Sequence, residues 1–238
     1  MLNLFLSGRM ITNYQNMITK DTFEFLSQLK ENNNRDWFAE NKKQYDAILK
    51  NATSFFTEIN TELAKTDSIE KMNVFRIYRD IRFSKDKSPY KTNFGVSFSR
   101  TKPMLRGGYY LHIEPDNSFV GGGFWAPNKD DLHRIRKEIE LDASELREII
   151  SDKNFKKMFG ELSGDELKTA PKGFDKIHPD IDLIRKKQYL VMRKFTNEEV
   201  LSNGFKSEVL ATFSAMRPFF DFMSSVLTTD LNGESLYK

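Results

Sequence analysis

The sequence predicts an α+β fold in which a central antiparallel β-sheet packs against a long N-terminal helix and several C-terminal helices. Apolar residues recur at steps of three and four between residues 35 and 65, which is the spacing of an amphipathic helix. Runs rich in β-branched and aromatic residues follow, and helical spacing returns after Pro127. Short turns join these runs, and short turns favour antiparallel over parallel strand pairing.

Two helices are expected before the sheet. Thr19 is a suitable N-cap for a helix that ends near Asn32, because its hydroxyl can accept a hydrogen bond from a free backbone N–H. Asn34 can cap the next helix in the same way. The apolar spacing then continues from 35 to 65 without glycine or proline, so we expect one uninterrupted helix there.

Five strands are predicted, at residues 74–83, 94–99, 109–114, 118–125 and 189–195. The turn residues 115–117 should join the third run to the fourth as a hairpin. In the first run Arg79 falls on the apolar face, where an unpaired cation is unfavourable. We therefore expect Arg79 to pair with a carboxylate or to reach water at the sheet edge. The consecutive glycines 121–123 predict a bulge or a close backbone approach.

Further helical runs occupy residues 132–139, 146–150, 155–159 and 209–227. Thr196 and Glu199 have the spacing of a capping box, which predicts a helix start directly after the last strand. Pro218 lies inside the final run, and we expect it to kink or restart that helix because it lacks a backbone N–H.

The chain contains no repeat, low-complexity tract or linker, so residues 17–238 are expected to form a single α+β domain. Residues 1–16 show neither helical nor strand spacing. We expect them to be a disordered or upstream extension, with Met10 or Met17 as the natural start.

The composition excludes several classes of site. The hydrophobic content of 39% and the 21 phenylalanines are those of a folded protein. The absence of cysteine excludes disulfides, thiolate metal sites and thiol nucleophiles, and a cytoplasmic location is the simplest expectation. No apolar run reaches the eighteen or so residues of a membrane-spanning helix, so no membrane partner is expected.

Positive charge is concentrated near the middle of the chain. Residues 76–106 contain nine basic and two acidic side chains, a local net charge of +7 in a chain whose net charge is +3. Such clustering favours an anionic partner. Residues 84–92 read as a polar loop of lysines and hydroxyls around Pro89, with Tyr90 placed to stack on a base or sugar. The candidate ligand-binding residues are Arg76, Tyr78, Arg82, Lys85, Lys87, Tyr90, Lys91 and Tyr110.

A second group of residues suggests acid–base chemistry. His112 and Glu114 are two positions apart on one face of a predicted strand, so the carboxylate can orient the imidazole as a general base. Asp80 is the candidate third member, and the same three side chains are the candidate catalytic residues. The pair also fits two metal ligands, but a hydrogen-bonded structural histidine accounts for it more simply, and no metal or cofactor is predicted.

Several segments together are similar to a known family. They are residues 32–38, Phe75-Arg-Ile-Tyr-Arg-Asp80, Ser84-Lys-Asp-Lys-Ser-Pro-Tyr-Lys-Thr92, 108–110, 112–115, Gly122-Gly-Phe-Trp125 and Pro171-Lys-Gly-Phe174 with His178-Pro179. In these segments the chain resembles the bacterial family called domain of unknown function 2461, from about Thr19 to Leu227. The resemblance implies a soluble, mostly bacterial protein with one α+β domain. It implies no activity and no catalytic residues.

Three functional hypotheses follow. The first is binding of a phosphate-bearing or other anionic ligand, either a nucleotide or a nucleic acid, at a basic sheet face and loop. The alternative is an enzyme of hydrolase or transferase type that acts on a phosphorylated or carboxylated small molecule through the His112–Glu114 pair. The third is that the charges only lock the sheet to the loop through ion pairs. We favour the first, and the oligomeric state is left open.

Overall fold

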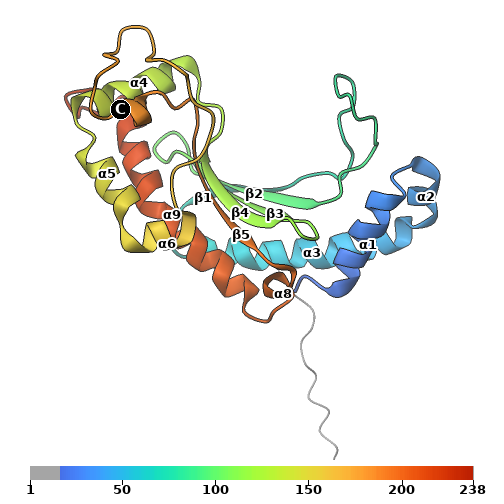
Figure 1. The fold of residues 1–238 in the computed structure, drawn as a ribbon. Coiled ribbons are helices and arrows are strands. Elements are labelled where there is room, and N and C mark those ends of the chain that lie inside the picture. The colour runs from blue at the N-terminus through green and yellow to red at the C-terminus, as the bar shows by residue number, and fades with distance from the viewer. Residues whose placement is uncertain (1–16, 238) are drawn as a thin grey trace, which may run out of the picture.

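An antiparallel sheet of five strands, paired in the order β1-β2-β3-β4-β5, forms the centre of the molecule (Figure 1). The structure is a computed structural model that describes residues 17–237; the proposed extension at residues 1–16 lies outside the described residues. The strands are β1 (Ile69–Val74), β2 (Phe94–Arg100), β3 (Gly108–Ile113), β4 (Ser118–Phe124) and β5 (Tyr189–Phe195). Every strand therefore pairs with the strand that precedes or follows it in the sequence.

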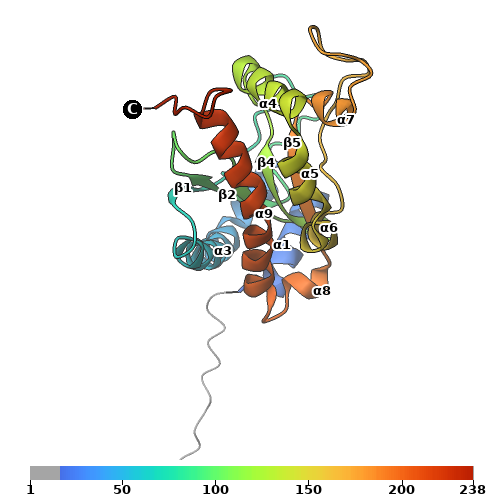
Figure 2. The same cartoon turned by 90° about the vertical axis from the view of Figure 1, so that its left-hand side faces the viewer.

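Helices surround the sheet on one side and at its ends. They are α1 (Lys20–Glu31), α2 (Arg35–Glu40), α3 (Lys42–Leu63), α4 (Lys129–Leu141), α5 (Ser144–Ser151), α6 (Lys153–Phe159), α7 (Ile181–Ile184), α8 (Asn197–Val200) and α9 (Phe205–Thr228). The two long helices α3 and α9 contact each other and cover the same face of the sheet (Figure 2). None of the helices within residues 17–237 has the length and apolar composition needed to cross a bilayer.

The core lies between the covered face of the sheet and α9. Alternate residues of β2 and β3 are buried, as expected for strands with one buried face. Phe98 and Tyr109 both contact the ring of Phe213 in α9. A Cβ at Gly122 would lie 2.8 Å from Met216 Sδ and from the Phe220 ring, so the strand and helix backbones approach closely there.

Most of the predicted architecture is confirmed. The α+β class, the antiparallel sheet and the helices on either side of it in the sequence are all present. The strand predicted at 189–195 has the observed bounds, and Thr196 and Glu199 form the predicted capping box. The Asn34 side chain accepts a hydrogen bond from the Trp37 backbone N–H and caps α2.

The prediction of one uninterrupted helix over 35–65 is wrong, because the chain leaves helical geometry at Asn41 and forms α2 and α3. The Asn41 side chain donates a hydrogen bond of 2.8 Å to the Trp37 carbonyl. Asparagine often competes with helical hydrogen bonding in this way. Pro218, in contrast, lies inside a continuous α9, so the predicted restart is also wrong.

The predicted strand at 74–83 is wrong as well. Strand β1 ends at Val74, and residues 75–93 form a projecting loop, here called the arm, which rises above the sheet in Figure 1. Only a single bridge, between Tyr78 and Tyr90, gives the arm a ladder-like contact. Asp80 and Asp86 accept hydrogen bonds from nearby backbone N–H groups, which replaces strand pairing by local turns.

A buried ionic cluster fixes β2 to α9. Arg100 is 1% exposed; its Nε lies 2.8 Å from the carboxylate of Asp67, and Nη2 donates to Asp221 of α9 at 2.5 Å. The Tyr109 hydroxyl also donates to Asp67. Burial raises the pKa of the Tyr109 phenol far above its ordinary value, so this hydroxyl stays a donor.

Replacing Asp67 with alanine should lower the free energy of unfolding by about 3 kcal/mol or more, because it leaves a buried guanidinium incompletely paired. Urea unfolding measures the change. The matched control Asp46→Ala removes an exposed carboxylate that pairs with Lys42 within α3, and it should lower the free energy by less than about 1 kcal/mol. Equal losses in the two variants would contradict the importance of the buried cluster.

Candidate functional site

The face of the sheet opposite α3 and α9 carries a regular array of side chains and glycines, and we call it the open face. Two neighbouring rungs of it consist of Gly95, His112, Phe119 and Lys194, and of Ser97, Tyr110, Gly121 and Met192. Because side chains alternate between the faces of a strand, all members of these rungs point away from the core.

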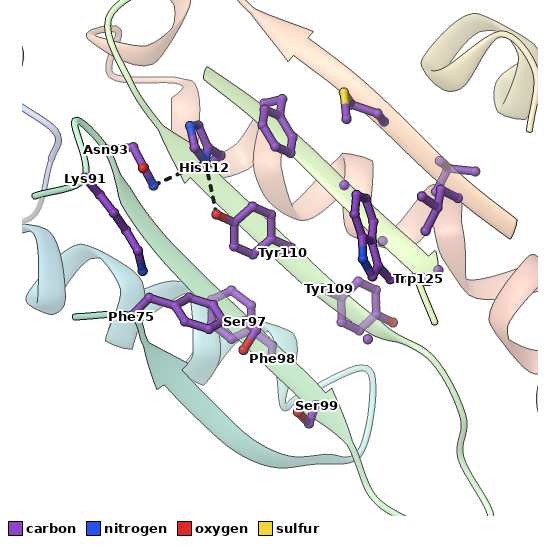
Figure 3. A pocket seen from close by; sticks show the side chains of 18 residues that line it. Phe75, Lys91, Asn93, Ser97, Phe98, Ser99, Tyr109, Tyr110, His112 and Trp125 are labelled. Carbon is purple, nitrogen blue, oxygen red and sulfur yellow. Dashed lines mark hydrogen bonds between the residues drawn. The ribbon is translucent and has the colours of Figure 1, made fainter. Parts of the chain in front are cut away.

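A cavity of about 770 Å³ lies on the open face (Figure 3). Its aromatic lining includes Phe75, Tyr110, Phe119 and Trp125. Its polar lining includes Lys91, Asn93, Ser97, Ser99 and His112. Gly121 and Gly123 contribute only backbone; a Cβ at Gly121 would already contact the Phe119 ring at 3.6 Å, and one at Gly123 would lie 2.2 Å from the Tyr189 carbonyl oxygen. The volume suits a small molecule, and most of the lining is apolar.

Lys91 and Trp125 mark two ends of this cavity, with Tyr110 between them (Figure 3). The Trp125 side chain is 69% exposed, which is unusual for so large an apolar group. Lys91 comes from the base of the arm; its ammonium donates to the Arg76 carbonyl at 3.0 Å and lies over the ring of Phe75. No carboxylate within the described residues forms an ion pair with Lys91. Burial, followed by the charge of Arg76, lowers its pKa.

His112 forms the centre of a hydrogen-bonded chain. Its Nε2 lies 3.1 Å from a carboxylate oxygen of Glu114, and its Nδ1 lies 3.0 Å from the Tyr110 hydroxyl and 3.3 Å from Nδ2 of Asn93. A carboxylate requires a donor, whereas an amide N–H and a hydroxyl can both donate. The arrangement therefore assigns the proton of neutral His112 to Nε2 and makes Nδ1 the acceptor. The ring also stacks on Phe119.

Burial and hydrogen bonding set the charges of this chain. Burial lowers the pKa of His112 below its ordinary value, and the opposing effect of Glu114 does not overcome it. Burial acts to raise the pKa of Glu114, but hydrogen bonds from Asn117, Thr92 and His112 outweigh it and lower the pKa. Burial raises the pKa of Tyr110, and the charge of Glu114 adds to the effect. Near neutral pH the chain is thus carboxylate, neutral imidazole and phenol.

Gly95 provides the space for this chain. A Cβ built at this position would lie 2.6 Å from the hydroxyl oxygen of Tyr110, closer than such contacts occur. Any larger residue would push the hydroxyl away from His112. The lack of a side chain at Gly95 in β2 therefore allows the Tyr110 hydroxyl in β3 to reach His112.

Asp80 does not join His112 and Glu114, which corrects its predicted place in the acid–base group. Its carboxylate binds the guanidinium of Arg82, at 2.6 Å, on the exposed arm. That hydrogen bond lowers the pKa of Asp80. Within residues 17–237 no three histidine or carboxylate side chains are grouped as metal ligands would be. The His112–Glu114 pair itself forms as predicted.

Three other cations of the arm, Arg79, Arg82 and Lys87, are held by local partners. Arg79 pairs with Asp86, which confirms the expectation that it finds a carboxylate. The ammonium of Lys87 donates to the Ile81 carbonyl at 2.9 Å, and Lys85 lies on the exposed tip of the arm. Of the predicted cationic ligand residues, the structure therefore brings only Lys91 to the cavity.

Tyr90 is not placed to stack on a ligand, which corrects its predicted role. It is 5% exposed, and its ring stacks on Phe38 of α2 at a centroid distance of 4.0 Å. The side-chain amide of Asn33 pairs with both the N–H and the carbonyl of Tyr90, which ties the arm to the loop before α2. Tyr78 contacts Tyr90 and does not line the cavity. Arg76 likewise lies outside the lining, with its carbonyl bound to Lys91.

The sequence of residues 21–222 matches the family described as conserved hypothetical protein (DUF2461). The chain belongs to the DUF2461 family. The match covers most of this DUF2461 chain, including all five strands and the whole arm. No curated protein and no solved structure matches the chain.

Sequence reasoning missed several residues that line the cavity of this DUF2461 protein. Phe119, Trp125 and Met192 were assigned to strands without a role, although alternation puts Phe119 and Met192 on the open face; Trp125 directly follows β4. The glycines of β4 did indicate an unusual site in the sequence, since they predicted a bulge or a close approach of another backbone. Asn93 carried no signal in the sequence, because its contact with His112 depends on the path of the arm.

The titration of His112 tests this geometry. Its ring protons, followed by NMR, should titrate below pH 6.5, since burial disfavours the imidazolium. Glu114→Gln should lower the midpoint further, because the carboxylate favours the charged form. As the folded-state pKa is depressed, His112 contributes stability that is present above pH 6.5 and lost as the pH falls below it. A midpoint above 6.5 would contradict the described environment.

Proposed function

We propose that the open-face cavity binds a small anionic molecule with a flat apolar body. The observation that carries the proposal is the position of Lys91, which has a backbone carbonyl as its hydrogen-bond partner and lies in a cavity walled by aromatic rings. A half-buried cation beside apolar surface attracts an anion more strongly than a fully exposed one, because water screens it less.

The shape and composition of the cavity indicate the rest of the ligand. The exposed ring of Trp125 offers a face on which a planar group can stack, whereas Phe119 is already stacked on His112 and adds apolar wall. The backbone of Gly121 and Gly123 forms a floor without side chains. Ser97 and Ser99 provide hydroxyls along the β2 side of the cavity. These features together suit an aromatic or heterocyclic body that carries one carboxylate, sulfonate or phosphate.

A small molecule is favoured over a nucleic acid. A polymer requires a row of available cations along its backbone. Arg79 and Arg82 are instead paired with acids of the arm, and Lys87 is bound to a carbonyl. The absence of cysteine and the family resemblance support the further proposal that the protein acts in the bacterial cytoplasm.

Two fluorescent probes test the proposal. One is 8-anilinonaphthalene-1-sulfonate, which has an aromatic body and one negative charge, and the other is N-phenyl-1-naphthylamine, which lacks the sulfonate. The wild-type protein should bind the sulfonate probe more tightly. Lys91→Met should weaken that binding by about tenfold, equivalent to about 1.4 kcal/mol, and should leave the neutral probe nearly unaffected.

The matched control is Lys85→Met, which removes an exposed lysine from the arm tip and changes the net charge by the same amount. It should not change either affinity beyond the small effect of net charge. The proposal fails if both lysine variants weaken the sulfonate probe equally, or if neither does. Trp125→Ala should weaken both probes, because both would lose the same stacking surface.

A further inference from the structure

The hydrogen bonds on β3 run from Glu114 through His112 to the Tyr110 hydroxyl, and ligand binding alone does not require this order. Glu114 is held in its ionised form by Thr92 and Asn117, and it fixes the imidazole of His112 through Nε2. The other ring nitrogen of His112 then faces the Tyr110 hydroxyl at 3.0 Å. A carboxylate, an imidazole and a hydroxyl in this order form the arrangement by which proteins activate a nucleophile.

We infer that Tyr110 is a nucleophile that His112 activates and Glu114 orients, so that the cavity carries out acyl transfer. This inference goes beyond the binding function, since it assigns a covalent step to the open face. Tyr110 lines the cavity, and it would be the residue that touches the substrate. His112 acts as the base, and Glu114 is a positioning residue.

The step balances without a further cofactor. The hydroxyl oxygen of Tyr110 forms a bond to the acyl carbon of an ester, and its proton passes to Nδ1 of His112. The bond between the acyl carbon and the leaving oxygen breaks, and the imidazolium returns the proton to that oxygen. Water then hydrolyses the acyl-tyrosine and restores the phenol. The tyrosine loses its proton to His112 only as the bond forms, so the step does not require a free phenolate in the resting state.

The surroundings favour an acyl centre over a phosphoryl centre. Phosphoryl transfer depends on several cationic groups arranged around the transferred group. In this cavity Lys91 is the cation that the lining provides, and most other lining groups are apolar. A tetrahedral acyl intermediate carries only one negative charge and needs no such set of cations. The substrate class is therefore an ester with an apolar body.

The uncharged reagent phenylmethylsulfonyl fluoride tests this inference without knowledge of the substrate. A tyrosine hydroxyl that attacks it forms an O–S bond, fluoride leaves, and the proton passes to the base. Peptide mass spectrometry then gives the labelling rate of each tyrosine. Tyr78 and Tyr237 are 48% and 40% exposed and serve as internal controls, because Tyr110 is less exposed than either.

Tyr110 should be labelled faster than both controls. His112→Gln should slow the labelling of Tyr110 by about 100-fold, the contribution expected of a general base, and should leave Tyr78 unchanged. Glu114→Gln should slow it as well. Circular dichroism verifies that both variants are folded, and the comparison within the wild-type protein needs no variant.

The pH dependence separates an activated tyrosine from an exposed one. The titratable groups that contact His112 are Glu114 and Tyr110, whereas its other neighbours, Asn93 and Phe119, do not titrate. Labelling of Tyr110 should level off above about pH 7, where His112 is neutral, whereas labelling of Tyr78 should show no plateau at that pH.

Labelling that ranks by exposure, or a Tyr110 rate that His112→Gln does not change, would overturn the inference. Because the reagent carries no charge, this result is independent of whether Lys91 binds an anion.

Discussion

The packing of α9 against one face of the sheet is the constraint on which the rest of the structure depends. Tyr109 and Phe98 contact Phe213 there, and Gly122 lets the backbones of β4 and α9 come close. The buried Arg100 cluster fixes the register of that contact, since it joins β2 to the same helix. The helices α3 and α9 lie side by side on the covered face (Figures 1 and 2), and the cavity lies on the opposite face.

The open face combines two properties that rarely occur together on a sheet surface. Gly121 and Gly123 add no side chains to the cavity, and the aromatic side chains make it apolar. Within it, His112 is held from both ring nitrogens, and Gly95 keeps the Tyr110 hydroxyl in reach. Binding and acyl transfer are therefore proposals about the same few side chains, but they depend on different members of the set. Lys91 carries the first, and Tyr110 carries the second.

The sequence predicts strands β2 to β5 well, because alternation and turn residues are local properties, but it misplaces β1. The sequence also predicts that His112, Glu114 and Tyr110 share one face, because residues two positions apart point to the same side of any strand. It fails in the arm, where alternating residues after Val74 resemble a strand but form local ion pairs. The charge cluster is misleading for the same reason. Whether a cation is free depends on which acid the fold places beside it, and sequence separation does not reveal this.

The most direct measurement of the central claim is a crystal structure of the protein with 8-anilinonaphthalene-1-sulfonate. We predict that the naphthalene ring lies over Gly121 and Gly123 beside Trp125, with the sulfonate at the ammonium of Lys91. Density for the probe on the α3 or α9 side of the molecule, or an open face that stays empty while the probe binds elsewhere, would contradict the account.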